Sequence, residues 1–388
     1  MRAVQAAVRR WWSRWGPGRS AARRIVTAWA LSRLGLVLAG WVALGRLPWQ
    51  YYSPAYNLSR WPWILMWVRW DALWYIAIAQ HGYWLRALAF FPFYPLTIAA
   101  LHWATGLSYP WAAVAIANAF LLAALFALYG LVRETVSRTC AERAVWSLLA
   151  YPTAFFASAA YTEGPFLGLS LFCFWTARRG QLWWAAVWAA LAAMTRNEGI
   201  FTAIAWAYAY WRRHGWRYHP EVWSGLIIPA GLLAFMGYQW TVFHDPLAFI
   251  AAQSYWGRHI TWPWVGLWLA IKGIAAGNPL QPGTVLSMMD VASGLGSMAL
   301  WGYAWRQRFP GEWLSYWGIL LVIDLAAPQV HGASPLLSLS RLVVILFPAY
   351  AALGQLSRRA IWRRGLAWTL PALQATLVAV YATWHWVA

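Results

Sequence analysis

The apolar positions of this chain form long continuous runs that recur from one end of the sequence to the other. Many runs approach the roughly 20 residues that a helix needs to cross a hydrocarbon core of about 30 Å. A helix that is apolar all round is buried in a large core or in a membrane. The pattern therefore predicts an all-α fold, a polytopic transmembrane helical bundle.

Short basic clusters separate the runs and divide the chain into about eleven predicted spans. The predicted spans are residues 25–44, 113–132, 144–159, 164–178, 182–195, 199–211, 222–243, 284–305, 313–327, 340–356 and 366–386. Some runs are shorter than a full crossing. Those spans rest on the alternation of charge more than on length.

Two segments, residues 45–112 and 244–283, do not fit as simple crossings because they are rich in Trp, Tyr and Pro. Proline breaks helices, so we expect short helices and turns there. Trp and Tyr concentrate at membrane–water interfaces, which predicts two external loops with interfacial helices. Without a visible linker or repeat, residues 1–388 are treated as one integral membrane domain, with residues 1–24 as a basic cytoplasmic N-terminus.

The charge of the chain is strongly basic, with 30 Lys and Arg against 10 Asp and Glu and a net charge of +20. Placing the basic clusters in the cytoplasm gives a consistent topology under the positive-inside rule, with the N-terminus inside. The charge is then topological, and no nucleic-acid partner is predicted; membrane lipids are the expected surroundings. The preference for Arg over Lys and the abundance of Trp, Ala and Gly favour a GC-rich prokaryotic genome and hence a plasma membrane.

The few carboxylates need a reason to exist, because a charge is costly where water is scarce. The predicted topology sorts them into two groups and a remainder. Glu134, Glu142, Glu221 and Glu312 fall among the cytoplasmic clusters, Asp71, Glu163, Glu198 and Asp245 fall outside, and Asp290 and Asp324 lie within spans near their outer ends. The outer face thus collects the carboxylates that arginine clusters do not explain.

Asp71 precedes an apolar stretch whose spacing predicts a short helix over residues 72–80, closed by Gly82. At that position an Asp either caps the helix N-terminus or serves as a general base in a recessed outer site. Spacing alone does not choose between these roles.

Other residues of the predicted outer face also have two possible interpretations. Glu163 is a solvated turn carboxylate or an acceptor of hydrogen bonds from a sugar, and Arg196 pairs with Glu198 or binds a donor phosphate. Arg341 pairs with Asp324 or binds the same phosphate, and His331 lies just before it. The cluster of Gln253, Tyr255, Trp256, Arg258 and His259 receives a carrier phosphate or forms an amphipathic interfacial helix.

No metal or other cofactor is predicted, because the eight His residues show no HxxxH or similar ligand spacing. A phosphate-binding P-loop and a serine-nucleophile elbow are also absent from the sequence.

The stretch Arg69-Trp70-Asp71, followed by Tyr75, Ala79 and His81-Gly82-Tyr83, resembles the first external loop of the PIG-V family, the transferases that add the second mannose of the GPI anchor, and of their bacterial relatives. Further stretches agree in order between residues 25 and 356. They are Phe90–Leu96, Tyr161-Thr162-Glu163, Thr195–Gly199, Asp245-Pro246-Leu247 and Ser340-Arg341-Leu342. Asn197-Glu198 departs from the small polar pair expected there.

The resemblance implies a GT-C glycosyltransferase in which Asp71 is the catalytic base and Arg69, Trp70, Tyr75 and His81 help to bind substrate. It also implies inverting transfer of a sugar, by resemblance mannose, from a polyprenyl-phosphate donor to a hydroxyl of a glycan or glycolipid at the outer membrane face. The alternatives are a transporter or flippase of a lipid-linked sugar and a non-catalytic subunit of a glycosylation complex. Transporters place charges near the bilayer midplane between inverted repeats; acids gathered at one face favour the enzyme.

Overall fold

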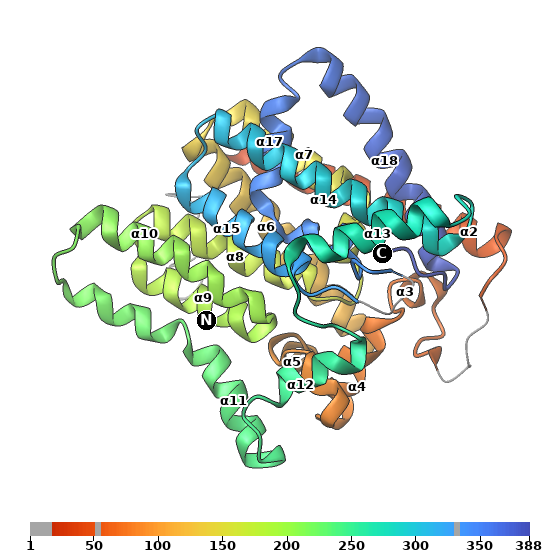
Figure 1. The fold of residues 1–388 in the computed structure, drawn as a ribbon, viewed down its shortest axis with the longest axis horizontal. Coiled ribbons are helices and arrows are strands. Elements are labelled where there is room, and N and C mark those ends of the chain that lie inside the picture. The colour runs from red at the N-terminus through yellow and green to blue at the C-terminus, as the bar shows by residue number, and fades with distance from the viewer. Residues whose placement is uncertain (1–17, 51–55, 330–333) are drawn as a thin grey trace.

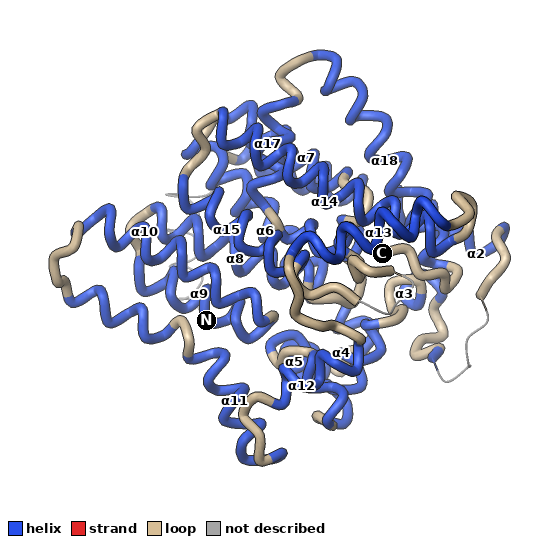
Figure 2. Tube along the Cα trace, in the orientation of Figure 1, coloured by secondary structure: helices blue, strands red, loops and turns tan. Residues whose placement is uncertain are grey.

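The computed structural model describes residues 18–50, 56–329 and 334–388, and its regular structure is helical throughout (Figure 2). Within these residues the only β pairing is an isolated antiparallel bridge between Arg258 and Gln329. The α-helices are α2 (Arg19–Arg46), α3 (Pro62–Leu65), α4 (Asp71–His81), α5 (Phe93–Thr105), α6 (Tyr109–Thr135), α7 (Arg138–Ala150), α8 (Glu163–Arg178), α9 (Leu182–Thr195), α10 (Ala203–His214), α11 (Ala230–Phe243), α12 (Ala248–Gln253), α13 (Pro263–Ala276), α14 (Pro282–Arg306), α15 (Gly311–Leu325), α16 (Leu339–Leu342), α17 (Phe347–Leu356) and α18 (Ala360–Ala382). The 3-10 helices are η2 (Leu85–Ala89), η3 (Ala154–Ala157), η4 (Asn197–Thr202), η5 (Pro220–Ile227), η6 (Ser254–Trp256) and η7 (Val343–Ile345). The predicted all-α fold is confirmed.

Helix α8 forms the centre of the packing, with α6 on one side and α9 on another, while α7 packs against α17 (Figure 1). Almost every residue of α8 is buried, which explains why its sequence is apolar on all faces. The largest fully buried side chains of the surrounding core include Trp175, Trp313 and Trp317. This core holds the ends of α8, α9 and α15 at fixed positions.

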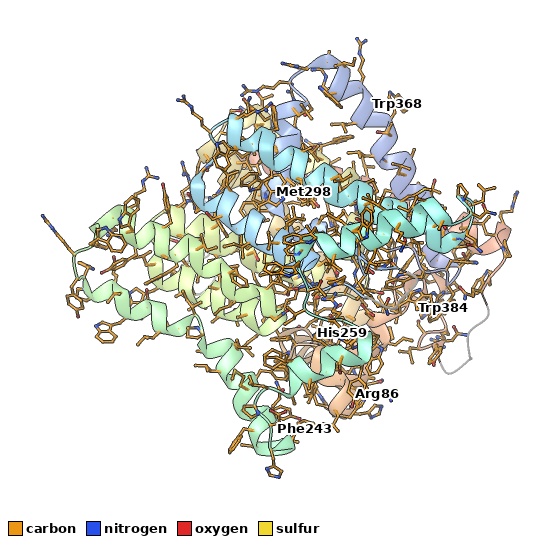
Figure 3. The ribbon with its side chains drawn as sticks, viewed as in Figure 1. Arg86, Phe243, His259, Met298, Trp368 and Trp384 are labelled. Atoms are coloured by element: carbon orange, nitrogen blue, oxygen red, sulfur yellow. The ribbon has the colours of Figure 1, made fainter. Side chains whose placement is uncertain are left out.

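Helices α2 and α18 pack against each other at one side of the molecule and expose large apolar side chains. Leu34 and Leu38 of α2 are each 55% exposed, and Trp368 of α18, on the outer side of its helix in Figure 3, is 81% exposed. Exposed apolar surface on this scale is typical of a face that contacts lipid or another protein. Three helices, α2, α6 and α18, are long and apolar enough to cross a membrane, and two bent helix pairs raise this number to five. The protein is an integral membrane protein, and the count of about eleven spans stays a prediction.

Two predicted spans are interrupted at prolines. The span predicted at residues 144–159 is broken after α7, where Tyr151 is extended and Pro152 follows. A residue before proline avoids the α conformation, so the helix has to end there. The span predicted at residues 340–356 bends by 85° between η7 and α17. The ring of Pro348 cannot continue a helix from the preceding turn, which accounts for this bend.

The two aromatic segments contain short helices, as the prolines predict. Residues 45–112 hold α3, α4, η2 and α5, and residues 244–283 hold α12, η6 and α13. Helix α12 packs against η2, and Figure 1 shows α4, α5 and α12 gathered at the lower edge of the molecule. The two segments therefore meet in space, although more than a hundred residues separate them.

The basic clusters and the outer carboxylates lie at opposite ends of the same helices. Helix α8 begins at Glu163 and ends at Arg178, and α15 begins next to Glu312 and ends next to Asp324. At the basic end, Glu134 pairs with Arg179, as predicted for the acids among the clusters. The carboxylates predicted for the outer face are thus gathered at one end of the bundle.

Candidate active site

A cavity of about 680 Å³ opens at the end of the bundle that holds the outer carboxylates. Its wall combines α4 and the residues around η2, the turn between α9 and η4, the segment 253–258, the residues around α16, and the chain after α18. Its charged lining residues are Asp71, Arg196, Glu198, Arg258 and Arg341. Residues far apart in the sequence thus share one pocket whose size suits a sugar and a phosphate.

Asp71 is the first residue of α4 and lines this cavity, directly after a strained turn. The preceding Trp70 has φ 53° and ψ −117°, a conformation that is unusual for a bulky side chain. The indole of Trp70 packs edge-on against Trp384 and Trp386, which hold it there. Backbone strain of this kind costs about 1–3 kcal/mol and persists where the surroundings fix it.

The carboxylate of Asp71 does not cap α4. Arg341 donates from Nη1 to Oδ2 of Asp71 at 2.7 Å, and the helix N-terminus has no side-chain cap. In the described part of the chain, Oδ1 has no hydrogen-bond partner. The local interpretation of Asp71 as an N-cap is therefore replaced by a long-range ion pair that engages one of its two carboxylate oxygens.

The ion pair belongs to a chain of alternating charges that links four elements. Nε of Arg341 lies 3.5 Å from Oε1 of Glu163, and Nη1 of Arg196 lies 3.7 Å from the same oxygen. Nη2 of Arg196 lies 3.4 Å from Oε1 of Glu198. Glu163, only 1% exposed, joins the two arginines beneath the cavity, so the reading of Glu163 as a solvated turn residue is wrong. Breaking a buried ion pair by removing one partner is strongly destabilising. This row of alternating charges therefore fixes the geometry of the site.

Arg341 is paired with Asp71 and Glu163, and the expected partner Asp324 is not among its ion pairs in the described residues. Asp290 instead holds the segment that presents Arg341. Its carboxylate accepts from the backbone N–H of Ser340 at 2.8 Å and from the hydroxyl of Ser334 at 3.2 Å. This anchor ties the start of α16 to α14.

Arg258 differs from the other two cavity arginines because it makes no ion pair with any described residue. Burial lowers the pKa of its guanidinium, while the nearby carboxylates of Glu198 and Asp324 raise it and Arg196 lowers it further. Burial acts most strongly on Glu198 and raises the pKa of its carboxyl, but Arg196, a backbone hydrogen bond and Arg258 together leave that pKa below its ordinary value. The charge of Arg258 is therefore the one that a bound anion would neutralise.

One wall of the cavity is aromatic. Trp74 stacks on Phe90 with ring centroids 5.5 Å apart and on Trp84 at the same separation, and Trp256 meets Trp74 edge-on at 5.3 Å. Flat aromatic faces of this kind present apolar area beside polar groups. The wall is suited to hold a sugar ring or the first part of a lipid chain.

Most residues predicted for the site line this cavity, and some lie elsewhere. Trp70, Asp71, Tyr75, Arg196, Glu198, Arg258 and Arg341 line it. Arg69 is fully buried behind it, donating to the carbonyl of Ala382 at 3.2 Å and lying over the ring of Trp384, so its position is structural. Exposed His81 and His259 are outside the lining, and His331 lies outside the described residues.

Several lining residues were not expected from the sequence. Trp384 and Trp386 reach the cavity because α18 ends at Ala382 and the chain turns inward. The sequence pattern placed residues 366–386 in a span, and no local signal marks this turn. Trp84 and Trp74 stand in the aromatic segment that includes Asp71, and their spacing carries no sign of their stacking.

Within the described residues, the carboxylates that line this cavity are next to arginine instead of histidine or cysteine. The described side chains that bring metal-ligand atoms together are at another place, the end of α10.

Comparison with protein-family models and with curated proteins finds no match for the sequence. The fold resembles ArnT from Cupriavidus metallidurans bound to undecaprenyl phosphate, with a TM-score of 0.54, 16% identity, and coverage of 94% of this chain and 69% of that one. ArnT in the apo state gives a TM-score of 0.35 at 13% identity, over 94% of this chain and 78% of ArnT. An oligosaccharyltransferase from Archaeoglobus fulgidus, in complex with Zn and sulfate, gives 0.43 at 12% identity, over 93% of this chain and 53% of that protein. The chain thus shares an all-helical fold with ArnT.

Proposed function

We propose that this protein is an inverting glycosyltransferase that moves a sugar from a polyprenyl-phosphate donor to an acceptor hydroxyl. The observation that carries the proposal is Asp71, which stands on the wall of a 680 Å³ cavity with one carboxylate oxygen held by Arg341 at 2.7 Å. A fold shared with ArnT, whose structure holds undecaprenyl phosphate, supports a lipid-phosphate donor.

The proposed reaction uses Asp71 as general base. As the acceptor oxygen forms its bond to the anomeric carbon, Asp71 takes the hydroxyl proton. The bond from the anomeric carbon to the donor phosphate oxygen breaks, and the polyprenyl phosphate leaves with the electron pair. Attack from the face opposite the leaving group inverts the anomeric configuration.

The cavity arginines have different tasks in this mechanism. Arg341 orients the Asp71 carboxylate and is itself held by Glu163. Arg258, unpaired among the described residues, offsets the charge that develops on the leaving phosphate, and Arg196 stands beside the same cavity. Preorganised positive charge at the leaving group lowers the barrier because it stabilises the transition state more than the ground state.

The sugar, the source and the orientation are further parts of the proposal. The sequence resemblance to the PIG-V family favours mannose, and the Arg-rich composition favours a prokaryotic plasma membrane. The positive-inside rule puts the basic ends of α8 and α10 in the cytoplasm and the cavity outside. In a prokaryote the acceptor is a glycan or glycolipid other than a GPI anchor.

The test is the substitution Asp71→Asn in proteoliposomes that contain a defined polyprenyl-phosphate mannose and an extract of membrane glycolipids as acceptor. Asparagine keeps a hydrogen-bond acceptor for Arg341 but cannot take a proton. We expect kcat for sugar transfer to fall by at least about a hundredfold. Asp245→Asn is the matched control, because Asp245 is exposed and only accepts from the backbone N–H of Leu247 at 2.8 Å.

The outcomes separate the candidate functions. Transfer by Asp71→Asn at the wild-type rate would rule out the base. Movement of the lipid-linked sugar across the bilayer, with no covalent product from the wild-type protein, would identify a transporter instead. A wild-type protein that is inactive alone but restores transfer to a partner would identify a non-catalytic subunit.

A further inference from the structure

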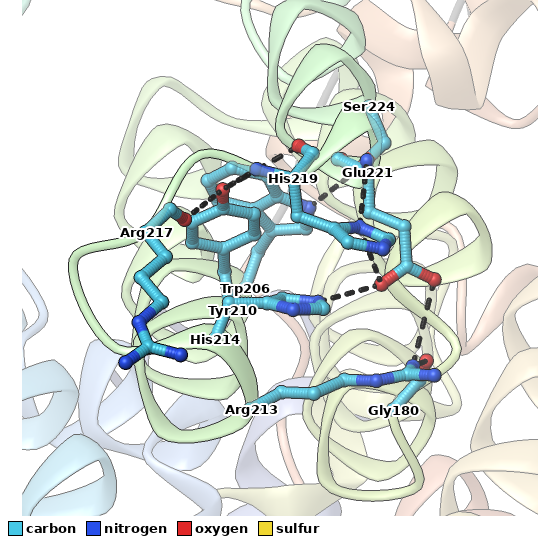
Figure 4. A network of polar contacts seen from close by, with 9 residues as sticks. All are labelled: Gly180, Trp206, Tyr210, Arg213, His214, Arg217, His219, Glu221 and Ser224. Carbon is cyan, nitrogen blue, oxygen red and sulfur yellow. Dashed lines mark hydrogen bonds and ion pairs between the residues drawn. The ribbon is translucent and has the colours of Figure 1, made fainter.

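We propose that His214, His219 and Glu221 form a binding site for one divalent transition-metal ion, with Zn²⁺ as the best match. The three residues lie where α10 ends and η5 begins, at the end of the bundle opposite the cavity, and Figure 4 shows them facing one another. The site is independent of the proposed glycosyl transfer.

The chain brings these residues together by a reversal. Helix α10 ends at His214, Gly215 follows with φ 61°, and η5 begins at Pro220 with His219 as its N-cap. A positive φ is readily adopted by glycine and turns the chain back on itself. The resulting spacing, His-x₄-His-x-Glu, is not the HxxxH pattern of one helix face. A search for helical ligand spacing therefore misses it.

The donor atoms of the three residues lie close together. Nε2 of His214 lies 2.9 Å from Oε2 of Glu221, and Nδ1 of His219 lies 3.7 Å from the same oxygen. The two imidazole rings stack with centroids 4.0 Å apart and an angle of 12° between their planes. One ligand atom from each residue lies within 4.8 Å of the other two. Ligands of a tetrahedral Zn²⁺, with bonds of about 2.0–2.2 Å, lie roughly 3.4 Å apart, so the two imidazoles have to rotate out of their parallel stack to direct both lone pairs at one ion.

The ligand types select the metal. Two imidazoles and one carboxylate suit zinc, which takes nitrogen and oxygen donors and leaves a fourth position for water.

Surrounding groups orient the ligands, as outer-shell partners do in metal sites. Arg213 lies 3.5 Å from the second carboxylate oxygen of Glu221 and donates to the carbonyl of Gly180 at 2.8 Å. The hydroxyl of Tyr210 accepts from the backbone N–H of His219 at 2.9 Å. The ion would thus hold the end of α10 against the start of η5. It would also fix the intervening turn, in which Trp216 is 94% exposed.

One contact competes with the metal. Nδ1 of His219 accepts from the backbone N–H of Glu221 at 3.3 Å, which is the N-cap bond of η5. The substitution His219→Asn separates the two roles, because asparagine caps helices well but offers no imidazole. The His214→Asn variant removes the other ring at the last residue of α10.

The experiment measures Zn²⁺ binding to the full-length protein, purified without a polyhistidine tag, by isothermal titration calorimetry in nanodiscs. We expect one equivalent of Zn²⁺ in the wild type, and affinity at least about a hundredfold weaker in His214→Asn and in His219→Asn, since even outer-shell changes cost 10–100-fold. Co²⁺ in place of Zn²⁺ should give the visible bands of a low-coordinate site. The matched control is His244→Asn, an exposed left-handed position where asparagine is tolerated.

Two results would overturn the proposal. One is the absence of saturable Zn²⁺ binding by a wild-type protein that elutes as a single folded species. The other is an unchanged affinity in both ring-deleted variants, which would place the bound ion elsewhere. A thermal unfolding midpoint that Zn²⁺ raises in the wild type but not in His214→Asn would support the proposal that the ion holds α10 and η5 together. An ion that binds only the folded state stabilises it by mass action.

Discussion

Arg258 and Arg341 line the same cavity, but their surroundings give them different roles. Arg341 is held between Asp71 and Glu163, and its guanidinium also lies over the ring of Trp386 at 5.6 Å. Arg258 has no ion pair among the described residues. An arginine with an established partner serves the structure first, whereas one without a partner is ready for a ligand.

This contrast predicts how alanine substitutions divide between binding and stability. Arg258→Ala should raise KM for the donor by roughly 10–150-fold, since a hydrogen bond to a charged group contributes about 1.5–3 kcal/mol, and should leave the thermal unfolding midpoint nearly unchanged. Arg341→Ala should lower stability by about 3–5 kcal/mol, because Asp71 loses its counter-ion and buried Glu163 loses one of its two arginine partners. Donor titrations and thermal unfolding of both variants check this. Equal loss of stability in the two would contradict the assignment of Arg258 to the donor.

At the scale of elements, η4 is fixed by its close approach to α9. A Cβ on Gly199 would overlap the backbone of Ala192 and Ala193, and Arg196 and Glu198 stand in the same short segment. The direct contact of two backbones leaves no flexible side chain to move aside. The position of two cavity residues therefore depends on a glycine that does not itself touch the cavity.

Gly199→Ala should consequently damage both stability and transfer. We expect a loss of at least about 1–3 kcal/mol from overpacking and a reduced kcat, because Arg196 and Glu198 shift with η4. The matched control is Gly237→Ala in α11, where a Cβ would meet no atom within 4 Å. Alanine there should be neutral or stabilising by about 0.5–1 kcal/mol. Thermal unfolding that ranks the two variants the other way would disprove the argument.

At the scale of the whole molecule, the two ends of the bundle carry different chemistry, and the proposed orientation follows from this asymmetry. Arg60 is exposed before α3, in the segment predicted to lie outside, and Arg359 is exposed where α17 leads into α18, within a basic cluster predicted to lie inside. The two native cysteines, Cys140 and Cys173, are fully buried and should react little.

Cysteine labelling in intact cells tests this orientation. A membrane-impermeant maleimide should label Arg60→Cys from outside and should label Arg359→Cys only after the membrane is permeabilised. The unsubstituted protein gives the background from its buried cysteines. The opposite pattern would invert the topology and put the cavity in the cytoplasm.

The sequence predicted what is local and periodic. The short helix after Asp71, the acids balanced by arginine clusters, and the breaks in the aromatic segments all follow from residues within a few positions of one another. Contacts between residues that are far apart in the sequence do not follow from such local patterns. The sequence singled out Asp71 and Arg341 separately, but nothing in it shows that they meet across 270 positions. The inward turn of Trp384 and the approach of His214 to Glu221 depend on backbone reversals that apolar periodicity does not record.

The residues that line the cavity come from nearly the whole length of the sequence, and this has a consequence for biosynthesis. Its wall needs Asp71 from the first quarter of the sequence, Arg341 from the last, and the indoles of Trp384 and Trp386 beyond α18. A nascent chain on the ribosome therefore carries Asp71 through the insertion of every intervening helix before its counter-ion is translated. Until then the Asp71 carboxylate has to keep its hydration near the membrane surface. The site is completed after synthesis, so a partly made chain left in the bilayer contains the proposed catalytic aspartate without the other residues of the cavity.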